Sequence, residues 1–119
     1  MKRILIVEDV DMNRDLLAQI LEEDYEVMEA VNGKAGYEMA LAEKPDLILM
    51  DMLMPEMTGD EATAKLRTHP EMADTPIIAV TAQAMDGDAE VALKAGCNDY
   101  VTKPIDEDVL MEKIRKYIG

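Results

Sequence analysis

The chain is poor in the residues that form covalent cross-links and thiolate metal sites. It has one cysteine, Cys97, one histidine, and no tryptophan or phenylalanine. A single cysteine excludes an internal disulfide, and one thiol with one imidazole cannot supply the ligands of a structural zinc site. We therefore expect Cys97 to be a buried structural thiol and any metal site to be built from oxygen ligands.

Basic residues and long apolar runs are also scarce. The 119 residues include 12 Lys and Arg against 26 Asp and Glu, which gives a net charge of -14. Such a surface repels nucleic acid and anionic membranes, so we expect no direct nucleic-acid ligand. Only four apolar residues, 4–7, separate Arg3 from Glu8, too few for a signal-peptide core, and no run approaches the length of a membrane span. The sequence predicts a cytoplasmic protein without membrane insertion.

Short apolar runs alternate with helical patterns along the chain. The continuous runs 4–7, 47–50 and 77–80 are typical of parallel strands buried on both faces. Residues 25–30 alternate more, as a peripheral strand does, and a last strand is expected around 100–101. Five amphipathic patterns follow these strands. The first has Met12, Leu16, Leu17, Ile20 and Leu21 on its expected inward face, with Asp11 as its cap, and the last begins near Asp106. This alternation predicts one α/β domain, residues 1–119, with a doubly wound five-stranded parallel sheet and five flanking helices.

Charged and hydroxyl side chains follow four of the expected strands. Glu8 and Asp9 follow the first strand, Asp51 the third, Thr81 the fourth and Lys103 the fifth. Ligands of open α/β sheets bind at the carboxyl ends of the strands. Carboxylates about 4 Å apart repel each other by roughly 4 kcal/mol, and one lysine cannot neutralise three of them. Mg²⁺ takes carboxylate and phosphate oxygens, so the sequence predicts a site for Mg²⁺ and a phosphoryl group together.

These residues, in this order, resemble the motifs of response regulator receiver domains. The resemblance covers essentially the whole chain, and the matched motifs are Glu8-Asp9, Asp51 with Pro55 and Gly59 behind it, Thr81-Ala82 and Lys103-Pro104. It implies a flavodoxin-like sheet of strand order 2-1-3-4-5. It also implies a phosphoacceptor signalling protein of a two-component or phosphorelay system rather than an enzyme. The implied partners are a histidine kinase or histidine phosphotransfer protein, which supplies the phosphoryl group, and a downstream protein target.

The resemblance assigns a role to each matched residue. Asp51 would accept the phosphoryl group in a self-catalysed reaction, and Lys103 and Thr81 would contact that group. The implied Mg²⁺ ligands are Glu8, Asp9, Asp51 and the backbone carbonyl of Leu53. Thr81 and Tyr100 would form the switch. The implied partner surface spans the fourth helix, the last strand and the fifth helix, with Asp88, Val91, Tyr100, Asp106 and Leu110. The sequence leaves open whether the protein is a monomer or a phosphorylation-dependent dimer.

Three neighbours of the site are expected to tune the lifetime of the phosphoryl group. Leu53 and Gln83 lie two residues after Asp51 and Thr81, and they border the path of the hydrolytic water in this family. Leu53 is apolar and cannot orient water, and Gln83 cannot act as a base. We therefore expect slow self-dephosphorylation. Ala82 is small and should leave the phosphate reachable by a donor or phosphatase.

Two other functions are compatible with the same fold class. A flavodoxin-like nucleotide-binding module would need a cradle of glycine and hydroxyl residues after the first strand, where Glu8, Asp9 and Asp11 stand. An aspartyl-nucleophile phosphatase of the haloacid dehalogenase type would need a second aspartate two residues after the first, where Leu53 stands. Within the receiver interpretation, no output domain follows Gly119. A single-domain regulator is therefore favoured over a receiver excised from a larger regulator or hybrid histidine kinase.

Overall fold

A five-stranded parallel sheet forms the centre of the molecule. The computed structural model describes residues 1–54, 57–82 and 88–119, except for the side chains of residues 88 and 89. The strands are β1 (Arg3–Val7), β2 (Glu26–Ala30), β3 (Leu47–Asp51), β4 (Ile77–Thr81) and β5 (Asp99–Thr102). Their order is β2-β1-β3-β4-β5, and every neighbouring pair is parallel. The predicted doubly wound, flavodoxin-like sheet is confirmed.

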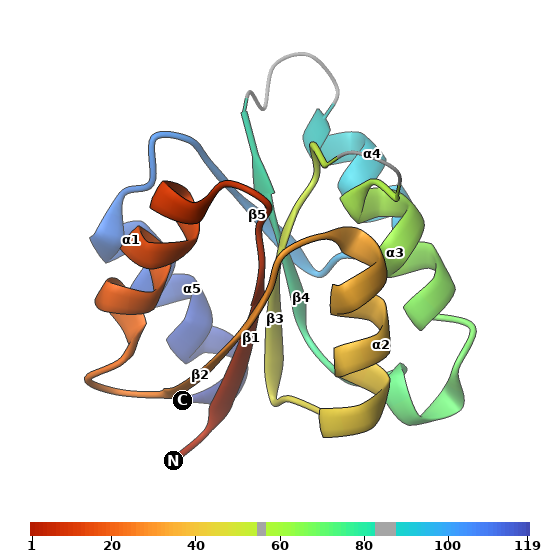
Figure 1. Cartoon of the computed structure of the whole chain (residues 1–119), viewed down its shortest axis with the longest axis horizontal. Coiled ribbons are helices and arrows are strands. Elements are labelled where there is room, and N and C mark those ends of the chain that lie inside the picture. Colours follow the sequence, from red (N-terminus) through yellow and green to blue (C-terminus); the bar gives the residue numbers. More distant parts are fainter. Residues whose placement is uncertain (55–56, 83–87) are drawn as a thin grey trace.

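Five helices cover the two faces of this sheet. They are α1 (Asp11–Leu21), α2 (Gly33–Glu43), α3 (Gly59–Leu66), α4 (Asp88–Ala95) and α5 (Glu107–Ile118). Helices α1 and α5 pack on one face, and α2, α3 and α4 pack on the other (Figure 1). A short 3-10 helix that the sequence did not predict, η1 (Pro70–Met72), lies between α3 and β4. Helices on both faces explain why the three central strands, β1, β3 and β4, are continuous apolar runs rather than alternating ones.

The side chains of the three central strands form two cores. Those that face α2, α3 and α4 are Leu5, Val7, Ile48, Met50, Ile77 and Ala79. Those that face α1 and α5 are Ile4, Ile6, Leu47, Leu49, Ile78 and Val80. All of them are at most 1% exposed. Burial of one such side chain contributes about 2 kcal/mol, so the carboxyl ends of β1, β3 and β4 are held firmly in place.

Side chains at the ends of several helices satisfy free backbone groups. The side chain of Asn32 accepts a hydrogen bond from the Ala35 N–H at the start of α2, and that of Asp106 accepts one from the Val109 N–H at the start of α5. Gly96 follows α4 with a φ of 120°, a conformation that favours glycine. The predicted start of the last helix near Asp106 is therefore confirmed.

The predicted inward face of the first helix is confirmed only in part, and its predicted cap is wrong. Leu17 and Leu21 are buried and Ile20 is half-buried, but Met12 and Leu16 are exposed. Val10, not Asp11, is the N-cap of α1, and the Asp11 carboxylate instead pairs with Arg14. Met12 is 80% exposed, whereas Leu17 is buried. Since successive residues of an α-helix are rotated by about 100°, Met12 lies about 140° from Leu17 around the helix axis. The apolar spacing therefore combined residues from two different faces.

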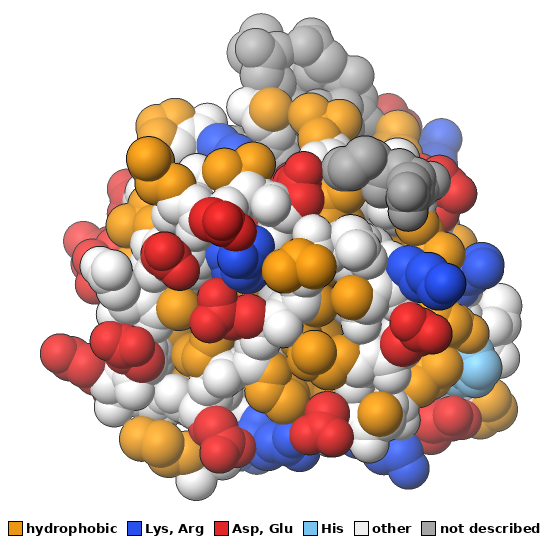
Figure 2. Space-filling model, viewed as in Figure 1, with side chains coloured by type: hydrophobic (Ala, Val, Ile, Leu, Met, Phe, Trp, Pro, Cys, Tyr) orange, Lys and Arg blue, Asp and Glu red, His pale blue; other side chains and the backbone are white. Residues whose placement is uncertain are grey.

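Acidic side chains are prominent on the face of the molecule that carries α1 and β2 (Figure 2). Their density reflects the net charge of -14. Within the described ranges, every helix is too short or too polar to cross a lipid bilayer.

Candidate magnesium and phosphoryl site

The predicted site residues converge at the carboxyl edge of the sheet. Glu8 and Asp9 follow β1 directly, while Asp51 and Thr81 are the last residues of β3 and β4. Lys103 follows β5 and its N–H donates to the Thr81 carbonyl. The strands are in register at this edge, since Val7 pairs with Met50 and Asp51 with Val80. The parallel sheet therefore brings together side chains that are up to 95 residues apart, from Glu8 to Lys103.

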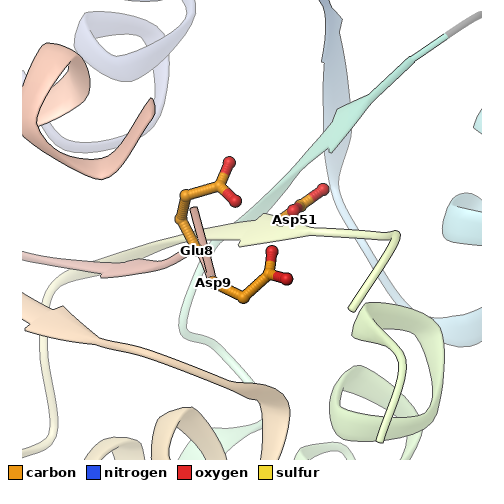
Figure 3. Close-up of side chains that lie close together, drawn as sticks. All are labelled: Glu8, Asp9 and Asp51. Carbon is orange, nitrogen blue, oxygen red and sulfur yellow. The ribbon is translucent and has the colours of Figure 1, made fainter. Parts of the chain in front are cut away.

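Three carboxylates form the acidic part of the site. One oxygen from each of Glu8, Asp9 and Asp51 lies within 4.8 Å of the other two (Figure 3). Glu8 is 1% exposed and Asp51 is 3% exposed, whereas Asp9 is half-buried. At this separation each pair repels by roughly 3 kcal/mol at an effective dielectric constant of about 20. The arrangement is costly unless a cation offsets it.

Lys103 supplies one positive charge to this cluster. Its Nζ atom lies 3.4 Å from Glu8 Oε1 and 3.5 Å from Asp51 Oδ1. One ammonium therefore lies between two buried carboxylates, and the third charge, on Asp9, has no basic partner within 4 Å among the described residues. The residual negative charge favours binding of a further cation.

Glu8 is the carboxyl group that this environment affects most clearly. Burial raises the pKa of Glu8 above its ordinary value, and its interaction with Asp51 raises the pKa further. The Val10 N–H, which donates to Glu8 Oε2 over 3.2 Å, acts in the opposite direction. The folded protein without a metal ion therefore holds the charged form of Glu8 at a free-energy cost.

Two oxygen atoms of the site are buried without a hydrogen-bond partner among the described residues. They are Glu8 Oε1, which has only the ionic contact with Lys103 Nζ at 3.4 Å, and Thr81 Oγ1. Leaving a buried polar atom unpaired costs about 1–3 kcal/mol, so such atoms commonly mark a place where a ligand binds. An oxygen-only donor set beside an unpaired hydroxyl fits a hard divalent cation and a phosphoryl group. The residues present are thus suited to Mg²⁺.

Gly59 allows the chain to turn closely behind Asp51. The Gly59 N–H donates to the Met52 carbonyl over 3.2 Å. A Cβ atom at Gly59 would overlap the backbone oxygen of Asp51 and would lie 2.6 Å from Met52 Cε. Leu53 lies two residues after Asp51, and its N–H donates to Asp51 Oδ1 over 3.2 Å. Its side chain is 65% exposed. The turn therefore fixes the Asp51 carboxylate and leaves the Leu53 side chain beside it in solvent. Pro55 lies outside the described residues.

The remaining predicted residues are more dispersed. Tyr100 is half-buried on β5, and the Lys113 ammonium lies 4.9 Å from its ring centroid. Ala82, Val91 and Asp106 are exposed. Gln83 and the side chain of Asp88 lie outside the described residues.

The placement of Leu110 on the partner surface is wrong. Leu110 is fully buried, and it packs in the core between α5 and the sheet. It lies on the sheet-facing stripe of α5 together with Ile114, four residues further on, which is the spacing of one helix face. Leu110 therefore supports the fold and cannot contact a partner in this conformation.

Sequence reasoning missed Arg14, which supports the loop that carries Glu8. Its guanidinium donates to the Glu8 backbone carbonyl over 2.9 Å and pairs with Asp11 and Glu29, and only 12% of its side chain is exposed. The available signal was that Arg14 is the only basic residue in the acidic segment 8–15. The arginine ties the site loop to β2.

Replacing Glu8 by glutamine should stabilise the metal-free protein at neutral pH. A carboxyl group whose folded pKa is raised contributes stability below its unfolded pKa and loses that contribution as the pH rises through the folded pKa. Glu8→Gln should therefore raise the free energy of unfolding by about 1–2 kcal/mol at pH 7, with no such gain near pH 4. Urea unfolding in EDTA measures this, with the exposed Glu112→Gln as control. Equal stability of native and variant protein at pH 7 would contradict the interpretation.

Comparison with known proteins agrees with this geometry. Residues 4–115 match the family model of the response regulator receiver domain. The chain is 40% identical over 119 residues to the polar-differentiation response regulator DivK of Brucella anthropi, a match that covers 99% of this chain and 97% of that relative. The chain therefore spans nearly the full length of this curated relative.

Solved structures show the same fold. The receiver domain of the sensor histidine kinase PA1611 from Pseudomonas aeruginosa has a TM-score of 0.93 at 35% identity, covers 99% of this chain and 98% of its own, and has a magnesium ion coordinated in its active-site cleft. The chemotaxis protein CheY4 of Vibrio cholerae has a TM-score of 0.91 at 25% identity, with 98% of both chains covered. The acidic cluster at the carboxyl edge of a 2-1-3-4-5 sheet, the family match and these relatives lead to one conclusion: the chain belongs to the response regulator receiver domain family.

Proposed function

We propose that Asp51 accepts a phosphoryl group from a phosphohistidine and that this modification changes a protein-binding surface of the domain formed by residues 1–119. The observation that carries the proposal is the position of the Asp51 carboxylate, which is 3% exposed, 3.5 Å from Lys103 Nζ and beside the carboxylates of Glu8 and Asp9. The donor would be a histidine kinase or a histidine phosphotransfer protein.

The proposed reaction is a phosphoryl transfer between two protein side chains. An Asp51 carboxylate oxygen forms a bond to phosphorus, the phosphorus–nitrogen bond of the donor breaks, and its electron pair remains on the imidazole nitrogen. Reactions of this kind require positioning and charge neutralisation more than covalent assistance. The buried end of β3 and the hydrogen bond from the Leu53 N–H supply the positioning of Asp51.

The surrounding residues would balance charge in this reaction. Mg²⁺, held by Glu8, Asp9, Asp51 and the Leu53 carbonyl, would offset the charges of the carboxylates and of the phosphoryl oxygens. Lys103 would pair with a phosphoryl oxygen, since its ammonium already lies beside Asp51. The Thr81 hydroxyl, buried and without a hydrogen-bond partner among the described residues, would donate to another.

The phosphatase alternative lacks a chemical group that it needs. Hydrolysis through an aspartyl nucleophile requires a general acid near the leaving group. The residue two positions after Asp51 is Leu53, whose side chain is apolar and cannot transfer a proton. A phosphoacceptor that releases its phosphoryl group slowly is the function that the site supports best.

The output surface would include Tyr100, Val91, Asp106 and Asp88. A phosphoryl group adds nearly two negative charges, which is enough to shift the segments that follow β4 and β5 between two arrangements. Thr81 and Tyr100 would be the switch residues, because Thr81 is the last residue of β4 and Tyr100 lies on the neighbouring strand β5. A downstream protein would recognise the changed surface.

Phosphoramidate tests this proposal directly, because it carries a phosphorus–nitrogen bond like that of phosphohistidine. With Mg²⁺ present, ³¹P NMR should show an acyl phosphate on the protein that does not form in EDTA. Binding of Mg²⁺ without any transfer would contradict the phosphoacceptor role of the site.

Replacing Leu53 by asparagine should shorten the lifetime of the phosphoryl group. The asparagine side chain can orient a water molecule that leucine cannot, so we expect hydrolysis to accelerate by about three- to tenfold. The measurement is the decay of phosphorylated protein after removal of the donor. Val31→Asn, another exposed apolar-to-amide change, is the control. An unchanged lifetime in Leu53→Asn would refute the proposed tuning role of Leu53.

A further inference from the structure

The outer edge of β2 is the feature that the proposed function leaves unused. Strand β2 pairs with β1 on one side, and no strand lies outside it in the described part of the chain. The Glu26 N–H donates to the Lys2 carbonyl, which shows that the backbone groups of Glu26 face β1. Backbone groups alternate in direction along a strand, so those of Val27 and Glu29 face outward. The edge thus presents hydrogen-bonding groups on which another strand can pair.

Two open grooves flank this edge. The groove between β2 and α1 has a volume of about 600 Å³ and is lined by apolar Ala18, Tyr25 and Val27 and by Glu22, Glu26 and Glu29. The groove between β2 and α2 has a volume of about 590 Å³ and is lined by apolar Met28, Met39 and Ala42 and by Glu29, Glu38 and Glu43. Figure 2 shows the face that carries α1, β2 and α2, with apolar side chains exposed between acidic ones. Both grooves therefore combine an apolar surface with carboxylates.

The geometry of an extended chain matches this arrangement. Successive side chains of a strand point to opposite faces of the sheet. A strand paired with the outer edge of β2 would therefore send alternate side chains towards the α1 groove and the α2 groove. Strand addition derives its affinity from backbone hydrogen bonds and its specificity from pockets for alternate side chains. Lysine and arginine, with apolar stems and cationic ends, suit both grooves.

The charges of the grooves select the kind of strand that fits. Arg3 lies 3.2 Å from Glu26 and 3.1 Å from Glu43, and Arg14 lies 3.2 Å from Glu29. The two arginines pair with three of the five groove glutamates, so the surface keeps a net negative charge. A second copy of β2 would bring Glu26 and Glu29 close to their own counterparts, and like charges on neighbouring strands destabilise the pairing. A basic strand would meet carboxylates instead.

We infer that the outer edge of β2 is a docking site for an extended basic segment of a partner protein, which adds a sixth strand to the sheet. The segment carries lysine or arginine together with aliphatic residues on both of its faces. Glu29 is the proposed specificity residue, because its carboxylate lies on the α1 side of the edge, 3.2 Å from Arg14, and the residue borders both grooves. The inference does not depend on phosphorylation of Asp51.

A blocked octapeptide, Lys-Lys-Val-Val-Lys-Lys-Val-Val, provides the probe. It places lysine and valine on both faces of an extended strand. We expect ¹⁵N–¹H NMR titration of the whole chain to show the largest shifts at the amides of Val27 and Glu29, with affinity that falls as salt is added. The same peptide N-methylated at every backbone amide should bind at least about tenfold more weakly, because neither of its two edges can then donate hydrogen bonds to β2. Equal affinity of the two peptides would overturn the inference.

Variants of the protein separate strand pairing from general charge attraction. Val27→Pro removes an outward-facing N–H at a position where an edge strand accepts proline, and it should weaken binding at least about tenfold. Thermal unfolding of the variant checks that loss of the partly buried valine side chain leaves the domain folded. Glu29→Lys should weaken binding by a similar factor. Glu112→Lys makes the same change in net charge at an exposed position of α5, and it should have little effect. The inference is overturned if Glu112→Lys matches Glu29→Lys, or if the peptide does not bind. Self-association of the native chain that Val27→Pro abolishes would also overturn it, since it would assign the edge to a second copy.

Discussion

Replacing Gly59 by alanine is expected to lower the free energy of unfolding by about 3 kcal/mol or more, the upper range for overpacking a rigid site. Gly59 is the first residue of α3, where helix propensity alone would make alanine more favourable than glycine by about 1 kcal/mol. The added Cβ would overlap the Asp51 backbone oxygen, which is part of a fully buried strand and cannot move aside easily. Urea denaturation measures the difference, and its sign discriminates between the two effects.

The same substitution should also disturb the chemistry at Asp51. Relief of the overlap requires the end of β3 or the start of α3 to shift, and either movement displaces the Asp51 carboxylate relative to Glu8. We therefore expect weaker Mg²⁺ binding as well as lower stability. Glu112→Ala, a change to alanine at an exposed position of α5, is the control. A Gly59→Ala protein as stable as the native chain would show that close packing of this turn against Asp51 is not required.

Replacing Lys103 by methionine should slow phosphorylation of Asp51 by about 10²-fold or more while leaving Mg²⁺ bound. Methionine approximates the length of the lysine stem but has no charge to place against a phosphoryl oxygen. Removal of the ammonium that lies 3.4 Å from Glu8 and 3.5 Å from Asp51 leaves the acidic cluster more negative. Mg²⁺ should therefore bind more tightly to the variant even though the reaction becomes slower.

These opposite changes distinguish a chemical role of Lys103 from a structural one. Single-turnover phosphorylation by phosphoramidate at saturating Mg²⁺ gives the rate, and metal titration gives the affinity. Lys94→Met is the matched control, since Lys94 is exposed on α4 and pairs with Glu90. A variant that loses Mg²⁺ affinity together with rate would indicate that Lys103 only maintains the fold of the site.

The sheet and the position of the site were predictable because they depend on strongly patterned residues. The continuous apolar runs at 4–7, 47–50 and 77–80 correspond to strands buried on both faces, and the polar residues after them must meet at one edge of a parallel sheet. Glu8, Asp9 and Asp51 are therefore expected to lie close together, and one oxygen of each lies within 4.8 Å of the other two.

Details that depend on packing between elements were not predictable from local patterns. Met12 and Leu110 are both apolar residues of amphipathic helices, yet Met12 is exposed and Leu110 is fully buried. Tertiary packing sets which side of each helix contacts the sheet, so an apolar residue on another side, such as Met12, remains exposed. The sequence marks Arg14 only as the one basic residue of the acidic segment 8–15, and the contacts by which it supports the Glu8 loop depend on the packing of α1 against β2.

The grooves beside β2 arise from tertiary structure in the same way. Strand β2 is more polar than the central strands, and its sequence pattern identified it as peripheral. Its flanking helices contribute small and flexible side chains such as Ala18 and Met39, which leave open grooves along the edge. Only the assembled fold shows that acidic residues from separate elements surround one strand.

Mass spectrometry of the intact protein after incubation with Mg²⁺ and acetyl phosphate tests the central proposal most directly, with native protein compared with Asp51→Asn. We predict one added phosphoryl group that is labile to hydroxylamine, that maps to Asp51 in the fragmented native protein, and that forms in neither EDTA nor the variant. A phosphoryl group that persists in Asp51→Asn, or that maps to another residue of the native chain, would contradict the assignment of Asp51 as the phosphoacceptor.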